Sequence, residues 1–457
     1  MSNLEISDFR FYVTSFVKDF LSKRKMEQIK PLIKIEYIDW LLTEIEEEGV
    51  RKKYQTEKED LIEEIKDNEK VEKYFNQFKN KRKQIIDEFS DRLVDLKAEI
   101  GVIPLAPFPY NEYNYIVAIE IKLGRVDTSG DPKPFEIFNL SRQIKSVMNE
   151  INEGEKQIWC DHLNLHPYAV IVADSLDGKT GVVWDKNTIE SNKRLLGSWV
   201  EYYSGQWDDY SEELYDERVY NNLSNRTSEL HYVRSNSAFI YMERKDPRWK
   251  DWLYGYMQTY FTEQILLARA ILFCIMVVNE ELDQVSERLR LMPSGAIKLI
   301  EKEISFVEDL NLAVSEISST LNRERLMNRL SHSTKIVYEC FRVFSLEQAA
   351  EVVSSKVAEI KESANSEYQK EAEKIQKQQE RWVLVLNALI GSQILFILKD
   401  QLTSIPYFGE NSDFVFFFDK FIWVVFGVLL VVSVGGLVYN WIKSKTTWLT
   451  KESEENK

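Results

Sequence analysis

Cysteine and histidine are scarce in this chain, which has three cysteines and four histidines among 457 residues. Cys160, Cys274 and Cys340 are far apart and odd in number, so we predict neither a disulfide framework nor a cysteine-based zinc site. A histidine-rich metal site is equally unexpected. Basic residues are fewer than acidic residues. The chain has 59 Lys and Arg and 74 Asp and Glu, which gives a net charge of −15. This balance argues against a large, unspecific nucleic-acid surface, and we expect no stable nucleic-acid partner.

Two apolar runs lie near the end of the sequence, at residues 382–398 and 421–439. Each is about long enough for a membrane-spanning helix, which needs roughly 17–25 residues. We predict a transmembrane hairpin over residues 382–443, with crossings at 382–403 and 421–440 and a tail at 444–457. Basic residues flank the hairpin and acidic residues fill its loop (Lys374, Lys377, Arg381, Lys443, Lys445 and Lys451 against Asp400, Glu410, Asp413 and Asp419). The positive-inside rule then predicts a multi-pass protein of the inner (cell) membrane with both termini in the cytoplasm.

The rest of the chain predicts an α+β protein. Residues 1–100 have a helical period amid dense Glu and Lys, and the proline-containing residues 101–110 indicate a connector. A cytosolic α/β domain follows at 101–245, with strands expected at 115–123, 168–173, 181–184 and 229–243 and a helix at 135–151. Residues 249–381 predict a helical bundle and a stalk, with Arg269 marking a buried core helix rather than a third crossing.

A long stalk helix is the clearest helical prediction. From Ser331 no proline or glycine occurs until Gly391. Apolar residues recur at three- and four-residue steps through this segment (Val353, Val357, Ile360, Ala364, Tyr368, Ala372 and Ile375). One helix from Thr334 to the end of the first crossing would be on the order of 100 Å long. Because the apolar stripe is narrow, we expect it to pack against copies of itself in a homo-oligomer.

The first apolar run contains polar residues. Asn387, Gly391, Ile394 and Leu398 share one helical face. Polar groups in a membrane helix face a bundle interior or a pore, so this face predicts the lining of an oligomeric channel. The alternative is that Asn387 and Gln393 only hold helices together.

This arrangement resembles the CorA family of divalent-cation channels. The resemblance lies in the long helix before the first crossing, in Gly409-Glu410-Asn411 between the crossings, and in the basic tail before Trp448-Leu449. It implies a funnel-shaped oligomer in the lipid bilayer, with Glu410 and Asn411 at the outer mouth of a cation pore. The chain departs from the family where Glu410 replaces the usual Met of the Gly-Met-Asn signature.

The cytosolic part is larger than that of housekeeping CorA transporters. In this respect the chain resembles the CorA-type effectors associated with type III CRISPR systems. That resemblance implies a channel gated by a nucleotide second messenger, such as an S-adenosylmethionine–AMP conjugate, in antiviral defence. A magnesium or cobalt transporter and a membrane-anchored nuclease are the alternatives. A divalent cation is the one cofactor that these alternatives would involve, and the sequence does not assign its ligands.

The nuclease alternative depends on one strand. Residues 119–122 read Ile-Glu-Ile-Lys and resemble the core of PD-(D/E)xK nucleases, in which carboxylates hold a metal ion and the Lys steadies the attacking water. The resemblance implies Glu120 and Lys122 as catalytic residues, with Asp95 as the upstream acid and Gln143 on the next helix. A strand with alternating charges on its outer face explains the same residues, and we favour a protein that is not an enzyme.

A third cluster lies on or beside the strand expected at 229–243. Arg226, His231, Arg234 and Asn236 could together hold a phosphate and a base of a small nucleotide-type ligand. A surface strand with ordinary charges is the alternative.

Overall fold

A computed structural model describes most of the chain. The described residues are 3–17, 23–44, 48–65, 69–93, 96–108, 111–126, 134–153, 166–201, 211–242, 261–293, 296–327, 331–403, 413, 416–417, 419–428, 431 and 435. They form two compact units. The first comprises Met1–Leu291 and Glu303–Glu362, and the second comprises Met292–Lys302 and Ser363–Lys457.

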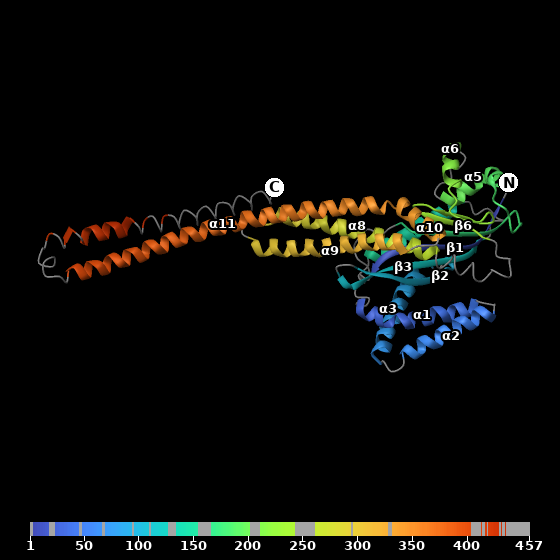
Figure 1. The fold of residues 1–457 in the computed structure, drawn as a ribbon, viewed down its shortest axis with the longest axis horizontal. Coiled ribbons are helices and arrows are strands. Elements are labelled where there is room, and N and C mark those ends of the chain that lie inside the picture. Colours follow the sequence, from blue (N-terminus) through green and yellow to red (C-terminus); the bar gives the residue numbers. More distant parts are fainter. Residues whose placement is uncertain are drawn as a thin grey trace. The chain divides into compact units, whose positions relative to one another are not determined.

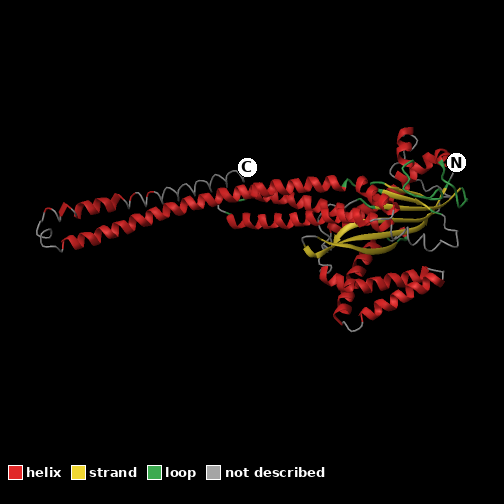
Figure 2. Cartoon of the chain, viewed as in Figure 1, coloured by secondary structure: helices red, strands yellow, loops and turns green. Residues whose placement is uncertain are grey.

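A six-stranded sheet organises the first unit (Figure 2). Its strands are β1 (Leu4–Val17), β2 (Glu99–Phe108), β3 (Asn111–Val126), β4 (Tyr168–Leu176), β5 (Leu230–Val233) and β6 (Ser237–Tyr241). They lie in the order β2-β3-β1-β4-β6-β5. Only the β4–β6 pair is parallel among these strands. The mixed sheet and its helices confirm the predicted α+β class.

Helices cover both faces of the sheet, because successive strand residues enter two different cores. On β3, Ile116 and Ala118 belong to one core, whereas Val117 and Ile119 belong to the other. Helices α1 (Lys23–Glu44), α3 (Glu69–Arg92), α4 (Pro134–Glu153) and α5 (Lys186–Glu201) pack in the second core. Helices α8 (Thr262–Leu291), α9 (Ile297–Met327), α10 (Ser331–Val343) and the start of α11 (Leu346–Thr403) pack in the first (Figure 1). Ion pairs join α2 (Glu48–Ile65) to α1, and α6 (Glu212–Val219) packs on α5.

The N-terminal hundred residues are not wholly helical, contrary to prediction. They begin with β1, which lies between β3 and β4 inside the sheet. The predicted domain boundary at residue 100 therefore cuts through one sheet. The connector predicted at 101–110 is also wrong over most of its length, because β2 occupies it. Pro104 and Pro107 are tolerated there since β2 is an edge strand, where a missing N–H breaks no ladder.

Two further strand predictions differ in detail. Residues 181–184 form no strand, because after Asp177-Gly178 only an isolated bridge pairs Leu176 with Lys179. The strand expected at 229–243 is instead the β5–β6 hairpin, which turns at residues 234–236. In the turn after β4, Asp177 has a φ of 50° and Gly178 a φ of 71°. This turn therefore uses the left-handed region that Gly and Asp adopt most readily.

The predicted stalk helix is interrupted. The chain turns at Phe344-Ser345, and Ser345 has a φ of 49°, so α10 and α11 are separate helices. The apolar stripe begins inside the chain rather than between copies, because Val353, Val357 and Ile360 are 2–6% exposed and pack with α8 and α9. Helix α11 as a whole runs unbroken from Leu346 to Thr403. Its 58 residues correspond to a length of about 87 Å at 1.5 Å per residue.

Large apolar side chains are exposed on the later part of α11, within the second unit (Trp382, Val383, Leu386, Leu389, Ile390, Ile394 and Ile397). Residues 419–428 are also helical, and Phe396 of α11 lies 5.6 Å from Trp423 and 5.9 Å from Phe426 between ring centroids. Within the described part of the chain, no helix meets the length and hydropathy needed to span a bilayer. The tail at 444–457 lies outside the described residues.

Candidate functional site

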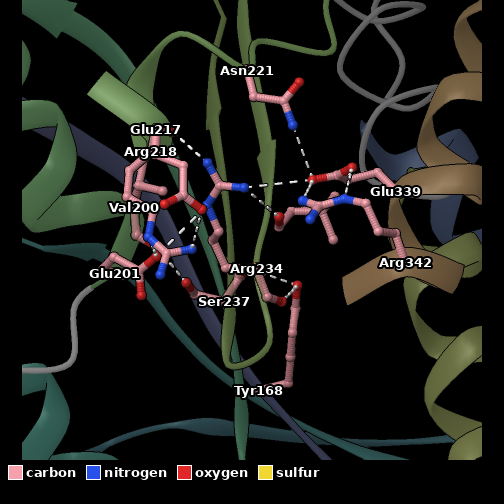
Figure 3. Close-up of polar contacts among 11 residues, drawn as sticks. Tyr168, Val200, Glu201, Glu217, Arg218, Asn221, Arg234, Ser237, Glu339 and Arg342 are labelled. Carbon is pink, nitrogen blue, oxygen red and sulfur yellow. Dashed lines mark hydrogen bonds and ion pairs between the residues drawn. The ribbon is translucent and has the colours of Figure 1, made fainter. Parts of the chain in front are cut away.

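Hydrogen bonds from several elements hold the β5–β6 turn of the first unit. Arg234 N–H donates to the Ser237 carbonyl at 2.7 Å, and the Tyr168 hydroxyl donates to the Ser237 carbonyl at 2.6 Å. Ser237 Oγ donates to the carbonyl of Val200 at the end of α5, at 2.5 Å. These bonds fix the backbone of Arg234, and its side chain therefore leaves the hairpin in a defined direction (Figure 3).

The Arg234 guanidinium lies between two carboxylates. It is 5% exposed, with Nε 3.7 Å from Glu201 Oε1 and Nη1 3.5 Å from Glu339 Oε1. Its Nη2 donates to the carbonyl of Arg218, and the Arg218 side chain also pairs with Glu201 at 3.0 Å (Figure 3). Arg234 therefore links α5, α6 and α10 in one charged network.

Glu339 is the acceptor that joins this network to the surface. Its Oε1 accepts from Arg342 at 2.6 Å and from Asn221 at 3.1 Å, and its Oε2 accepts from Arg342 at 2.9 Å. The Glu339 side chain is 9% exposed, whereas Arg342 is 62% exposed. Glu339 therefore links the buried Arg234 to the exposed Arg342.

Burial dominates the electrostatics of the network. It lowers the pKa of Arg234, and the nearby Glu201 and Glu339 carboxylates offset part of that shift. Burial also raises the pKa of Glu201, while Arg218 and Arg234 act in the opposite direction. Both shifts reflect the cost of removing charge from water, so each charge depends on its partner.

An open cleft of about 830 Å³ lies beside Glu339. Its lining combines amide, hydroxyl, aromatic and charged side chains (Asn221, Asn222, Leu223, Thr334, Lys335, Tyr338, Glu339, Phe341, Arg342, Ser345, Glu347 and Gln348). The positive charges of Lys335 and Arg342 equal in number the carboxylates of Glu339 and Glu347, so the lining has no net formal charge. Because the lining includes the α10–α11 turn at Ser345 and the first residues of α11, the cleft borders the joint between these helices.

The predicted ligand cluster is divided by the fold. Arg234 is buried in the ion-pair network, and Arg226 is bound by Glu229 at 3.2 Å. Asn236 occupies the hairpin turn, where its carbonyl accepts from Ala169 N–H at 3.0 Å. His231 is 1% exposed and packs 5.0 Å from His332 and 5.8 Å from Phe261 between ring centroids. None of these four residues lines the cleft that lies beside Glu339.

Sequence reasoning missed Glu201, Arg218, Asn221, Glu339 and Arg342. One signal was available: Glu339 and Arg342 are three residues apart on a helix, a spacing at which side chains meet. Nothing in sequence spacing joins them to Arg234, which is 105 residues away from Glu339.

The buried histidine predicts acid sensitivity. Burial lowers the pKa of His231 well below its usual value, so the unfolded chain binds a proton at a pH where the folded chain does not. Stability from this group is present above the unfolded pKa of about 6.5 and is lost as the pH falls below it. We expect His231→Phe to show a shallower loss of unfolding free energy between pH 7 and pH 5, roughly the range set by that pKa, in urea titrations. Parallel pH profiles for the variant and the unchanged protein would contradict this.

The nuclease residues that the structure describes are divided between the two faces of the sheet. Glu120 accepts from Arg10 at 2.8 Å and from the Tyr12 hydroxyl at 2.7 Å, and Lys122 pairs with Glu99 at 3.5 Å. Gln143 is on α4, whose buried residues pack in the core on the opposite face of β3 from Glu120. Asp95 lies outside the described residues. In the described ranges no three acidic, histidine or cysteine side chains gather as metal ligands.

The predicted pore residues lie partly outside the described set. Asn387, Gly391 and Ile394 are on α11, where Asn387 and Ile394 are exposed and Gly391 is half-buried. The side chain of Leu398, together with Gly409, Glu410 and Asn411, lies outside the described residues. The pore assignment remains a prediction.

No family model, curated protein or solved structure matches this chain.

Proposed function

We propose that this protein is an oligomeric membrane channel of CorA-like architecture that is gated by a small nucleotide-type ligand. In this proposal residues 382–403 and 421–440 cross the inner membrane, several copies form the pore, and both termini are cytoplasmic. A role as a type III CRISPR antiviral effector follows from the enlarged cytosolic part. The S-adenosylmethionine–AMP conjugate is the proposed messenger.

The observation that carries the proposal is the change of surface along α11. At Val353 and Val357 the apolar side chains of this helix are buried in the soluble core. From Trp382 to Ile397 seven of its large apolar side chains are exposed; Ile394, for example, is 56% exposed. Contiguous exposed apolar surface of this kind marks a lipid or protein contact. The flanking charges of the sequence favour lipid over a soluble partner.

A second observation supports gating. The cleft borders the joint at Ser345, a non-glycine residue held in the left-handed region. Residues Glu347 and Gln348 of the cleft lining belong to α11, the same helix that carries the exposed apolar segment. A ligand that binds differently to two arrangements of this joint would shift their populations, which is the requirement for gating.

Reconstitution tests the proposal. The purified full-length protein should be a ring of several copies in detergent and should release a small ion from liposomes when ligand is present. The control is Leu386→Lys with Leu389→Lys, because both positions are off the Asn387–Ile394 face and two charges on the lipid-facing part of a membrane helix cost about 2.5–3.5 kcal/mol each. We expect this variant to remain in the soluble fraction. A monodisperse monomer by light scattering, or liposome binding that the two lysines leave unchanged, would contradict the proposal.

A further inference from the structure

Helix α10 presents a row of three exposed side chains to the cleft. Lys335, Tyr338 and Arg342 line it and follow one another at steps of three and four residues, so they share one helical face. Tyr338 is 47% exposed. The helical rise places Lys335 about 4.5 Å before Tyr338 and Arg342 about 6 Å after it along the axis. An accessible aromatic ring therefore has a cation on each side.

The neighbouring contacts hold both cations in place. Lys335 Nζ donates to Asn225 Oδ1 at 2.7 Å, and Arg342 is fixed by two hydrogen bonds to Glu339. Both bonds of Arg342 use Nε and Nη2, so its Nη1 is directed elsewhere. Asn221 and Asn222 also line the cleft, but their amide groups are bound within the protein, Asn221 to Glu339 and Asn222 to the carbonyl of Glu229. The exposed ring of Tyr338 offers a surface on which a base can stack.

We infer that this cleft binds a dinucleotide-class ligand, with one base stacked on Tyr338 and an anionic group at Lys335 and at Arg342. A single inorganic phosphate would meet only one cation and no stacking surface. A ligand with two anionic groups separated by a base meets the whole row. This inference deepens the proposed function, because it assigns the ligand class and the residues of the gating site.

The position of the site connects it to the buried network. An anionic group at Arg342 competes with Glu339, which also binds Asn221 and Arg234. Weakening the Glu339–Arg342 pair changes the charge balance around Arg234 without any contact between the ligand and Arg234. The cleft therefore gives the bound ligand a route to α5 and α6 as well as to the α10–α11 joint.

Binding to the full-length protein in detergent tests this inference, with calorimetry as the measurement. The probes are the linear diadenylate with a 5′-phosphate, AMP and inorganic phosphate. We expect the diadenylate to bind most tightly and inorganic phosphate to bind at least about tenfold more weakly, since loss of stacking removes about that factor. Tyr338→Ala should weaken diadenylate binding by about tenfold, whereas Tyr338→Phe keeps the ring and should change it less than about twofold. Arg342→Gln should weaken diadenylate binding because it removes one of the two cations, whereas Arg290→Gln, the matched charge control at an exposed position of α8, should leave binding unchanged.

Any of three results would overturn the inference. The protein does not bind the diadenylate at about 1 mM, or it binds inorganic phosphate and the diadenylate with equal affinity. The third is a Tyr338→Ala variant that is folded by circular dichroism and binds the diadenylate with unchanged affinity. Failure of the channel proposal would be seen separately. Diadenylate binding that depends on Tyr338 without ion release from liposomes would leave the cleft assignment in place and remove the channel.

Discussion

Replacing Arg234 with Ala should lower the free energy of unfolding by about 3 kcal/mol, because it leaves Glu201 and Glu339 without the guanidinium between them. Both carboxylates are largely buried, with side-chain exposures of 22% and 9%. Each keeps one other arginine, Arg218 for Glu201 and Arg342 for Glu339. We therefore expect the lower end of the range for a broken buried ion pair. Urea unfolding followed by tryptophan fluorescence measures the change.

Two variants separate a charge effect from a packing effect. Arg226→Ala removes another arginine of the same region, but Arg226 is 49% exposed and pairs with Glu229 alongside it, so the loss should be less than about 1 kcal/mol. Adding Glu201→Gln to Arg234→Ala removes one of the uncompensated charges and should restore part of the lost stability. If Arg234→Ala and Arg226→Ala have equal effects, the network is not the stabilising element that its burial indicates.

Asn387→Leu should reduce ligand-stimulated ion release by more than about tenfold, because a ring of leucines at this level favours dewetting of the pore. Glu120→Ala and Lys122→Ala should leave ion release and toxicity on activation largely intact. Glu120 is bound by Arg10 and Tyr12 on the sheet and is needed for function only if it holds a metal ion for catalysis. Liposome flux and growth after induced expression measure both effects.

Gln393→Leu is the matched control for Asn387→Leu. It makes the same kind of change, but Gln393 is off the helical face that Asn387, Gly391 and Ile394 share. Its flux should stay close to that of the unchanged protein. The reverse pattern would favour the nuclease. In that case Glu120→Ala would abolish toxicity, Asn387→Leu would retain it, and nucleic acid would be cut only by the protein that keeps Glu120. The membrane segment would then be an anchor.

Local patterns predicted several elements correctly. The apolar run at 168–173 became β4, and the helical period at 135–151 became α4, because periodicity reports which face of an element is buried. Arg269 was also interpreted correctly as part of a buried helix. It is 3% exposed, lies over the Tyr168 ring and donates to the carbonyl of His166.

Errors occurred where distant partners decide the structure. Residues 4–17 form a central strand because β3 and β4, more than 90 residues later, pair with them on both sides. Pro104 and Pro107 lie in a strand because that strand is at the edge of the sheet. The stripe at Val353 and Val357 has a local pattern suited to self-association, yet α8 and α9 of the same chain cover it.

By itself the sequence determined the α+β class, the helical character of residues 346–403 and the apolar character of their later part, since each depends on neighbouring residues alone. The prediction extended this helix back to Thr334 and missed the turn at Ser345. Only the tertiary structure joined Glu201, Arg234 and Glu339, which are separated by 33 and 105 residues along the chain. It also brought Asn221 and Asn222 into the lining of the same cleft as Tyr338. A buried charge is stable only beside its partner, and that partner is chosen by packing of the whole unit rather than by local spacing.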